Sequence, residues 1–374
     1  MSIIQMGYSE YVYDAWLASA DIPPARLRRI LDQFTSAEAC YEAFMKKDPH
    51  LMDIIPERIR FSLAQNAETD RLGWFSRQIE IHGIHVLHYE DQEFPDSLRK
   101  IDDAPSFFFY QGCIQCFRQP AIAIVGSRAA TYSGQKASEK LSEELSRRGI
   151  AIISGLACGI DAAAHRGCLK GESPTIAVTG CGLDRVYPSD NTRLRDEILL
   201  KGGVILSEYA PGAKPSGWHF PVRNRLIAGL AVALVLMEAK IRSGSMTSVQ
   251  HALDQGKDVF VYPGDPVSEK YEGNHQLLRE GGIYFTSAED ILEDLHLLDK
   301  KSALGQNTQC AGDGKNLSPE EILVLSALEP GALGFEELLV HTGLDASGLM
   351  SVITLLQIKG HIEALPGKVY QIKL

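Results

Sequence analysis

Residues 121–128 read Ala-Ile-Ala-Ile-Val-Gly-Ser-Arg, and residues 151–165 read Ala-Ile-Ile-Ser-Gly-Leu-Ala-Cys-Gly-Ile-Asp-Ala-Ala-Ala-His. Each stretch is a short apolar run that stops at a loop of glycine and serine and then continues into a helical pattern. Uninterrupted apolar runs are typical of strands buried on both faces of a parallel sheet. The loop after such a strand opens on a helix N-terminus, where free N–H groups favour an anion. The two stretches therefore predict a parallel α/β sheet with an anion site at its edge.

The loop after the first stretch differs from the dinucleotide fingerprint. That fingerprint requires G-x-G-x-x-G after the strand, whereas Gly126 is followed by Ser127 and Arg128. A P-loop is also absent from the sequence. Arg128 contributes a planar, permanently charged donor that suits a phosphate group. The loop is therefore expected to bind a phosphate, but not a pyrophosphate against bare backbone.

The same alternation of apolar runs and helical patterns continues along the chain, which predicts a doubly wound sheet with helices on both faces. Strand cores are expected at residues 122–125, 150–153, 175–178, 204–206, 231–237 and 259–262. Helices are expected at residues 134–148, 161–169, 194–200, 223–228 and 246–255. Ligands of such sheets bind outside the carboxyl ends of the strands. The loops at those ends, and the helix after one of them, carry a set of basic side chains: Arg128, Arg185, Lys214, Arg223, Arg225, Lys240 and Arg242.

Charge is distributed unevenly along the 374 residues, whose net charge is −11. Residues 1–120 carry −6, residues 121–250 carry +5 and residues 251–374 carry −10. A local basic field inside an acidic chain can still bind a polyanion. The central segment, which contains the anion-type loops, is therefore the expected binding region; chance clustering of charge is the alternative.

Bulk features restrict the class of protein further. No apolar run reaches the roughly 18 residues of a membrane helix, and residues 1–10 lack the pattern of a signal peptide. The seven cysteines are scattered, which predicts reduced thiols and a cytoplasmic location. A single Cys113-x-x-Cys116 pair lacks the further ligands of tetrahedral zinc, so no metal is expected.

Four regions are expected along the chain. Residues 1–75 predict a helical domain similar to sterile-alpha-motif or helix-hairpin-helix modules, and residues 76–300 predict an extended Rossmann-like domain. Residues 301–316 are polar and glycine-containing, as in a linker. Residues 317–374 predict three helices, the last at 345–359, and a hairpin, which is the pattern of a winged helix. Because this last region is acidic, we expect it to bind protein or to regulate the main domain.

Eight motifs in order make the chain resemble the DNA-processing protein A (DprA/Smf) family. They are Val-Gly-Ser-Arg at 125–128, Ser-Gly-Leu-Ala-x-Gly-Ile-Asp-x-x-Ala-His at 154–165, Gly-Leu-Asp-x-x-Tyr-Pro-x-x-Asn at 182–191, Ser-Glu at 207–208, Phe-Pro-x-Arg-Asn-Arg-x-Ile-Ala-Gly-Leu at 220–230, Glu-Ala-x-x-x-Ser-Gly-Ser at 238–245, Pro-Gly at 263–264 and Gly-Asn-x-x-Leu-Leu at 273–278.

The resemblance implies a non-catalytic protein without a cofactor that binds single-stranded DNA, forms a homodimer and loads the RecA recombinase onto that DNA in natural transformation. Many members carry a basic residue where this chain has Cys158; Arg166 or Lys170 could substitute for it. The residues expected to bind DNA are Gly126, Ser127, Arg128, Gly155, Lys170, Tyr187, Asn191, Arg223, Asn224, Arg225, Ser243 and Gly244. The residues expected at the dimer interface are His275, Leu277, Leu278 and Tyr284.

The alternative is an enzyme, a nucleotide phosphoribohydrolase of the lysine-decarboxylase-like Rossmann group. That group is similar in fold but typically carries Pro-Gly-Gly-x-Gly-Thr, whereas this chain has Pro263-Gly264-Asp265. General acid–base chemistry also needs suitably placed acids. The acids near the loops stand singly and can be explained as helix caps or loop anchors: Asp161, Asp184, Glu208 and Glu238.

Overall fold

The structure is a computed structural model that describes residues 8–297, 319–328, 331–342, 344, 349–350, 352–353, 356–357, 362–365 and 369–372. They belong to two compact units, Met1–Cys310 and Ala311–Leu374. The predicted linker at 301–316 lies outside the described residues. The predicted domain boundaries stay predictions.

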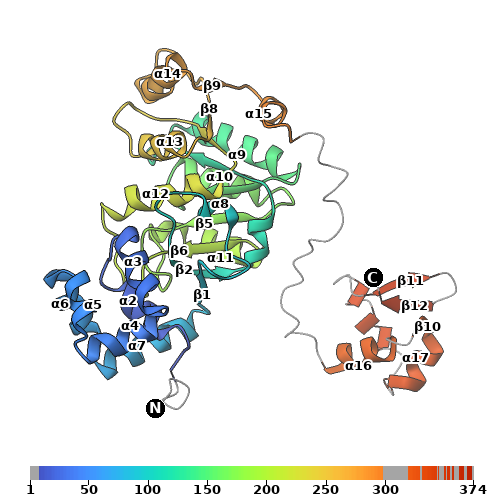
Figure 1. Cartoon of the computed structure of the whole chain (residues 1–374). Helices are drawn as coiled ribbons and strands as arrows, with labels where there is room; N and C mark the ends of the chain where they lie inside the picture. Colours follow the sequence, from blue (N-terminus) through green and yellow to red (C-terminus); the bar gives the residue numbers. More distant parts are fainter. Residues whose placement is uncertain are drawn as a thin grey trace. The chain divides into compact units, whose positions relative to one another are not determined.

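The first unit is built on a nine-stranded sheet with the strand order β1-β2-β6-β5-β4-β3-β7-β8-β9 (Figure 1). Strands β3 to β9 are parallel to one another. Strand β2 pairs antiparallel with β6 and with β1, and so adds an antiparallel edge to the sheet. The α/β fold class is confirmed, and so are all six predicted strand cores. The strands are β1 (His85–His88), β2 (Phe107–Gly112), β3 (Ala121–Val125), β4 (Ala151–Ser154), β5 (Thr175–Val178), β6 (Val204–Ser207), β7 (Ala233–Leu236), β8 (Asp258–Val261) and β9 (Ile283–Tyr284).

Helices cover both faces of the sheet because its central strands are apolar on both sides. All five residues of β3 are buried, with the even-numbered isoleucines on one face and the alanines on the other. One face packs against α8 (Asp96–Arg99), α12 (His219–Leu230), α13 (Ser245–Asp254) and α14 (Glu272–Arg279). The other packs against α9 (Tyr132–Ser146), α10 (Ile160–Cys168), α11 (Thr192–Leu200) and α15 (Ala288–Asp294). Three short 3-10 turns complete the unit: η1 (Ile114–Arg118), η2 (Ser189–Asn191) and η3 (Glu269–Tyr271).

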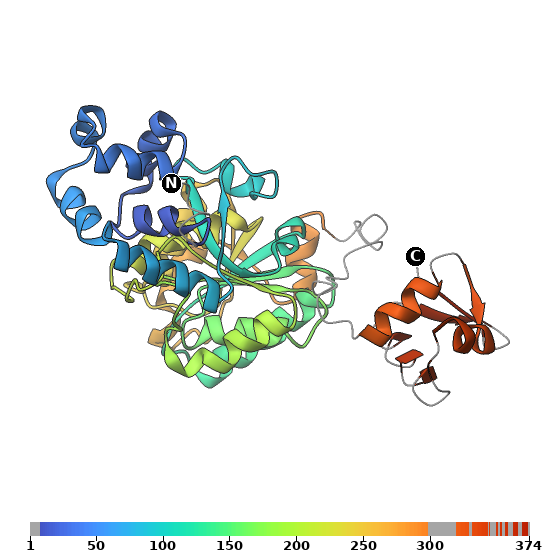
Figure 2. The same ribbon diagram turned by 90° about the horizontal axis from the view of Figure 1, so that it is seen from below.

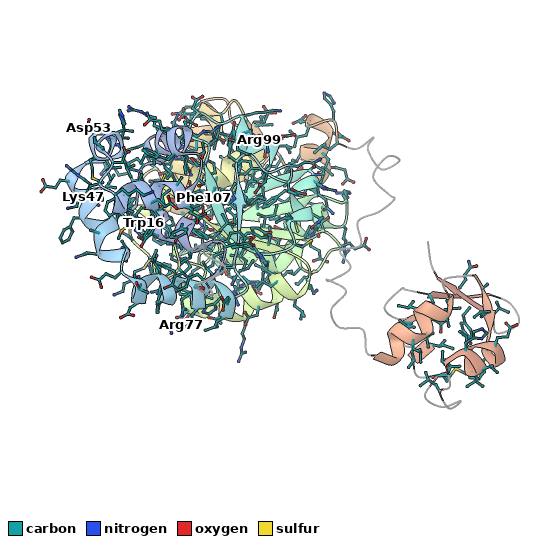
Figure 3. The ribbon with its side chains drawn as sticks, turned by 60° about the horizontal axis from the view of Figure 1, so that its bottom comes forward. Trp16, Lys47, Asp53, Arg77, Arg99 and Phe107 are labelled. Atoms are coloured by element: carbon teal, nitrogen blue, oxygen red, sulfur yellow. The ribbon has the colours of Figure 1, made fainter. Side chains whose placement is uncertain are left out.

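The N-terminal helices pack around Trp16 (Figure 3), whose indole N–H donates to the Leu63 carbonyl at 3.0 Å. Their apolar core continues into side chains of the sheet, including Phe107 and Ile205, so these helices sit directly on the β1–β2 side of the unit (Figures 1 and 2). They are α2 (Val12–Ala18), α3 (Pro24–Phe34), α4 (Ala37–Met45), α5 (Pro49–Ile54), α6 (Glu57–Asn66) and α7 (Thr69–Ile81).

The second unit has a three-stranded antiparallel sheet with the order β10-β12-β11. The predicted hairpin is confirmed as the pair β11–β12. Val324, Leu338, Leu356 and Tyr370 are buried in a core of its own. Parts of the predicted helix at 345–359 lie outside the described residues. The elements are α16 (Pro319–Leu328), β10 (Leu333–Gly334), α17 (Phe335–Thr342), β11 (Ile362–Leu365) and β12 (Val369–Ile372).

The strand order of the first unit reverses between β3 and β7. From β3 the chain builds outward through β4 and β5 to β6, and then returns to place β7 on the other side of β3. Loops at such a switch point leave in opposite directions and open a crevice at the carboxyl edge. The fold therefore puts its crevice beside residues 126–131 and 237–244.

Candidate nucleic-acid interface

Two glycine loops cross at the carboxyl ends of β3 and β4. The Ser127 amide donates to the Glu238 carbonyl at 2.7 Å, and the Ile160 amide donates to the Ser127 carbonyl at 3.2 Å. Gly159 makes this crossing possible, since its φ is +76° and a Cβ there would lie 2.2 Å from the Ser127 oxygen. No side chain fits such a gap. The crossing holds the residue after Ser127 in a fixed position at the mouth of the crevice.

A cleft of about 630 Å³ opens above this crossing. It is lined by the loop after β3, Ala157 and Asp161 after β4, the start of α12 and the loop after β7, with Tyr187, Pro215 and Gly217 closing it. The structure therefore brings together eight of the residues expected to bind DNA: Gly126, Ser127, Arg128, Tyr187, Arg223, Asn224, Ser243 and Gly244.

Arg128 is the exposed cation of this cleft. Its guanidinium carbon lies 4.6 Å from the centre of the Phe220 ring, and Tyr187 stacks on the same ring at 5.6 Å and 30°. Among the described residues, no carboxylate lies within 4 Å of Arg128. Cation–π contact with Phe220 orients the guanidinium without neutralising it. Arg128 is thus held ready for an external anion.

Arg223 forms the back wall and is only 4% exposed. Its Nη1 donates to the Gly155 carbonyl at 3.0 Å and its Nε to Asn224 Oδ1 at 3.3 Å. Burial lowers the pKa of Arg223 to about 10; the Asp161 carboxylate opposes this shift, and the positive charge of Arg128 adds to it. Burial likewise raises the pKa of Asp161, against the stabilising charge of Arg223. The wall is a desolvated arginine whose positive potential faces the same cleft as Arg128.

Gly155 belongs to this wall through its backbone. Its amide donates to Asp161 Oδ2 at 3.2 Å. A Cβ on Gly155 would lie 2.6 Å from Arg223 Nη2 and 2.7 Å from Asp161 Oδ2. Glycine is needed here because the two charged side chains close in on the backbone from both sides. Gly155 therefore positions Arg223 and does not line the cleft.

Three other residues predicted to bind DNA lie outside the cleft. Arg225 is 1% exposed and its two Nη atoms donate to the Glu208 carboxylate at 2.6 and 2.7 Å. Lys170 is exposed but pairs with Glu139 on the outside of α9. Asn191 is buried, and its side-chain amide donates to the Leu156 carbonyl at 2.9 Å. Each makes structural contacts, and none of the three lines the cleft.

Asn191 has a local role that its motif did not reveal. Leu156 is a buried non-glycine residue with a φ of +55°, a conformation that is strained for an L-residue. The bond from Asn191 helps to fix this turn between β4 and α10. Arg166, which is exposed on α10, does not line the cleft, and neither do Lys170 and Cys158.

The loop after β7 completes the rim. The Asn224 side-chain amide donates to the Gly244 carbonyl at 3.4 Å, and the Ser243 and Ser245 hydroxyls are 2.7 Å apart. The loop leads into α13, which lacks a side-chain cap at its N-terminus. Hydroxyl groups beside a helix N-terminus are suited to donating hydrogen bonds to a phosphate.

The four acids near the cleft each make a contact within the protein. Asp161 accepts from the Gly155 amide, and Asp184 accepts from the Gly212 amide at 2.8 Å. Glu208 pairs with Arg225. Glu238 is fully buried and accepts from the Thr131 hydroxyl at 2.6 Å and from its amide at 2.9 Å.

Within the part of the chain that the structure describes, no three His, Cys, Asp or Glu side chains are grouped to hold a metal ion. No helix among the described residues is long and apolar enough to cross a membrane.

Sequence reasoning missed Phe220, the ring on which Arg128 and Tyr187 both lie. It stands in the quoted Phe-Pro-x-Arg motif, three residues before Arg223. An aromatic residue at the entrance of a helix that follows a basic loop was the available signal.

The residues expected at a dimer interface lie on and after α14. Leu277 is 5% exposed and packs inward on the sheet, so its side chain is not available to a partner; this corrects its assignment. Leu278 and His275 are half-buried, and the His275 ring bonds to the Pro263 carbonyl at 2.9 Å. Tyr284, at the far edge strand β9, is 57% exposed.

Comparison with known proteins gives consistent results. Residues 85–296 match the family described as DNA recombination-mediator protein A, and residues 311–368 match the DprA winged helix domain. The chain is 44% identical over 204 residues to the DNA processing protein DprA of Streptococcus pneumoniae, covering 54% of this chain and 72% of that protein.

Two solved structures are similar to a large part of this chain. The X-ray structure of DprA from Streptococcus pneumoniae superposes with a TM-score of 0.64 at 33% identity, over 75% of this chain and 95% of that one. DNA processing protein A of Helicobacter pylori superposes with a TM-score of 0.52 at 29% identity, over 57% of this chain and 95% of that one; that structure is described as giving insight into its single-stranded DNA binding mode.

Proposed function

We propose a function from the premise that the chain belongs to the DNA recombination-mediator protein A family: it binds single-stranded DNA in the cleft between β3 and β7. The similar Helicobacter pylori protein is described as binding single-stranded DNA. The observation that carries the proposal for this chain is Arg128, an exposed guanidinium in a cleft of about 630 Å³, held on Phe220 and paired with no carboxylate among the described residues.

The cleft offers the two interactions that sequence-tolerant binding of a single strand uses. Arg128 and the desolvated Arg223 provide positive potential for the phosphates, and phosphate neutralisation dominates affinity. Tyr187, 42% exposed, provides an aromatic face next to them. Stacking of a base on such a face contributes about 1–3 kcal/mol. In a duplex the base faces are already stacked on one another, so this arrangement favours a single strand.

The proposal extends to the biological role that the family resemblance implies. The chain acts without catalysis as a mediator in the cytoplasm, loading RecA onto incoming single strands during natural transformation, and it does so as a homodimer. The wild type should stimulate RecA filament formation on a single-stranded oligonucleotide, and Arg128→Ala should not. Equal stimulation by both proteins would contradict the link between this cleft and loading.

For the homodimer, we assign the two-fold contact to half-buried Leu278 on α14 and to exposed Tyr284 on the edge strand β9, since such a contact uses the same surface of both subunits. Leu278→Arg should sediment as a monomer where the wild type is a dimer, because a charge would be buried without a partner. Leu200→Arg is the control, since Leu200 is 87% exposed on α11. A wild type that sediments as a monomer would rule out the dimer.

The test of DNA binding is a salt titration of affinity for an unstructured oligonucleotide. Arg128→Ala should weaken binding about tenfold and flatten the slope of log K against log salt by about 0.7, the value for one phosphate contact on a single strand. Arg193→Ala is the matched control, because Arg193 is an exposed arginine on α11 that does not line the cleft. Unchanged affinity and slope in Arg128→Ala, or tighter binding of a duplex by the wild type, would refute the proposal.

A further inference from the structure

A second cavity, of about 350 Å³, lies between the N-terminal helices and the loop that follows β6. One side is formed by the end of α2 and by Asn66 and Arg71 at the junction of α6 and α7. The other side is the segment 210–219. Nothing in the function proposed above uses this cavity.

Arg71 is a partly buried cation with free donors toward this cavity. Its Nε donates to Asn66 Oδ1 at 3.0 Å, and its guanidinium lies 4.1 Å from the centre of the Trp74 ring. Gly212, with a φ of +89°, lets the opposite wall approach: a Cβ there would be 2.7 Å from Trp74 and 3.3 Å from Arg71 Nη2. Burial lowers the pKa of Arg71, and the charge of Asp184 opposes that shift. Within the described residues no carboxylate lies within 4 Å of Arg71.

His219 is a buried residue in the wall of the same cavity. The ring is 3% exposed and its Nδ1 lies 3.0 Å from the Gly180 carbonyl, which fixes Nδ1 as the donor. Nε2 has no hydrogen-bond partner; Asp21 Oδ1, at 3.7 Å, is beyond hydrogen-bond distance. With Nδ1 as the donor, Nε2 is left as a hydrogen-bond acceptor.

The wall between this cavity and the DNA cleft is a single segment of chain. Lys214, Ser216, Trp218 and His219 line the second cavity, whereas Pro215, Gly217 and Phe220 line the cleft. Lys214 is exposed and Trp218 is 49% exposed. A DNA strand that leaves the cleft over this segment reaches the Trp218 ring and the cations Lys214 and Arg71.

We propose that this cavity is a second subsite for the same single strand: Arg71 and Lys214 bind a phosphate, and Trp218 contacts a base. The inference rests on the proposed function of the cleft. Two cations outweigh Asp21, the carboxylate among the lining residues, and the second cationic wall comes from the N-terminal helices. The helices thus extend the DNA path instead of serving only as a packing appendage.

The experiment measures binding of the full chain to oligothymidylates of about 6 and about 30 nucleotides, which fill one subsite or more. Lys214→Ala and Arg71→Ala should each weaken binding of the long oligonucleotide about threefold to tenfold and flatten its salt slope by about 0.7. Binding of the short one should be unchanged. Arg128→Ala should weaken both. Arg77→Ala is the matched control, because Arg77 is an exposed arginine on the same helix that does not line the cavity (Figure 3).

Lys214→Ala keeps the test decisive if Arg71→Ala perturbs the packing of Trp74. An unchanged slope and affinity of Lys214→Ala for the long oligonucleotide would overturn the second subsite while leaving the cleft intact. Failure of the wild type to bind either oligonucleotide would overturn both. If inorganic phosphate raises the melting temperature of the wild type but not of Lys214→Ala, while long-oligonucleotide binding is the same in both, the cavity is a free-anion site and the DNA subsite is wrong.

Discussion

Arg128 and Arg225 both stand in motifs expected to bind DNA, yet the structure gives them opposite environments. Arg128 is exposed at the crevice, lies on the Phe220 ring and has no carboxylate partner among the described residues. Arg225, two residues after Arg223 in the same helix, is 1% exposed and bound by Glu208 and Asp103. An arginine that is exposed and faces no carboxylate can bind an external anion, whereas one that is buried against carboxylates forms an internal ion pair.

The environment of Arg225 also determines its charge. Burial lowers its pKa, but the carboxylates of Glu208 and Asp103 raise it by more, so the net direction is upward. The Nε–Asp103 distance is 2.9 Å, although the N–H does not point at the oxygen, so this contact is an ion pair without hydrogen-bond geometry. Arg225 therefore stays charged because its partners are internal, whereas Arg128 is available for a partner from outside.

The largest effect that this comparison predicts is on folding. Arg225→Ala leaves the Glu208 carboxylate, whose side chain is 16% exposed, without its bidentate partner. Removing one member of a buried pair costs about 3–5 kcal/mol. We expect a loss of that size in the free energy of unfolding, measured by urea denaturation, while Arg128→Ala stays within about 0.5 kcal/mol of the wild type.

The double variant Arg225→Met, Glu208→Leu provides the control for this prediction. Replacing both ions by apolar side chains of similar volume removes the uncompensated charge, so most of the lost stability should return. If Arg225→Ala were as stable as the wild type but failed to bind DNA, Arg225 would be a contact residue and the comparison would fail.

A second, smaller effect is expected where the backbone holds Arg223. Gly155→Ala puts a methyl group within 2.6 Å of Arg223 Nη2, so the arginine and Asp161 must move apart. Such overpacking costs about 1–3 kcal/mol, and displacement of Arg223 should weaken DNA binding as well. Gly217→Ala is the matched control, because it lines the same cleft with nothing within 4 Å of the added Cβ. Equal behaviour of the two variants in unfolding and binding would show that Gly155 is not needed to position the wall.

The sequence predicted the architecture because periodicity reports burial directly. The apolar run at residues 122–125 could only be a strand covered on both faces, and the structure has it at the centre of the sheet. The loop with Arg128 was predictable for the same reason, since the end of a buried strand must reach the carboxyl edge. The antiparallel pairing of β1 with β2, and of β2 with β6, was not predicted, because strand order depends on contacts far apart in the sequence.

The parts of the site that sequence did not predict depend on pairing across the chain. Nothing local to Arg225 indicates that Glu208 and Asp103 converge on it. Lys170 was likewise plausible on charge alone, yet Glu139 of the neighbouring helix pairs with it. A basic residue in a motif has the right chemistry, but only the fold determines whether its counter-ion is a side chain or a ligand.

A third prediction concerns the pH dependence of stability, and it rests on the buried His165. Burial and the charges of Arg223 and Arg166 lower the pKa of His165 to about 3. The neutral ring is hydrogen-bonded to the Thr175 hydroxyl at 2.7 Å. Because the unfolded chain binds a proton near pH 6.5 and the folded chain does not, stability falls as the pH drops from 6.5 toward 3.

The expected size of this effect is about 1 kcal/mol between pH 7 and pH 5.5, from one extra proton taken up on unfolding. Urea denaturation of the wild type and of His165→Asn across this range measures it. The variant should lose about that much of the pH dependence, whatever its absolute stability. Identical pH slopes in the two proteins would mean that the pKa of His165 is the same in the folded and unfolded chain.

The smallest expected effect separates charge from geometry at Arg128 itself. Arg128→Lys keeps the positive charge but replaces the planar guanidinium that lies 4.6 Å from the Phe220 ring with a compact, more strongly hydrated ammonium. Loss of an exposed cation–π contact amounts to about 0.5–1 kcal/mol, so affinity for single-stranded DNA should fall about twofold to fivefold. The salt slope should not change, because the number of phosphates neutralised is the same.

Adding Phe220→Leu should then lower the affinity for DNA less in the Arg128→Lys variant than in the wild type, since the ring would no longer orient the charge. If Arg128→Lys instead flattened the slope as much as Arg128→Ala, the aromatic ring would be essential for the ionic contact itself, and burial and counter-ions alone would not explain the difference between Arg128 and Arg225.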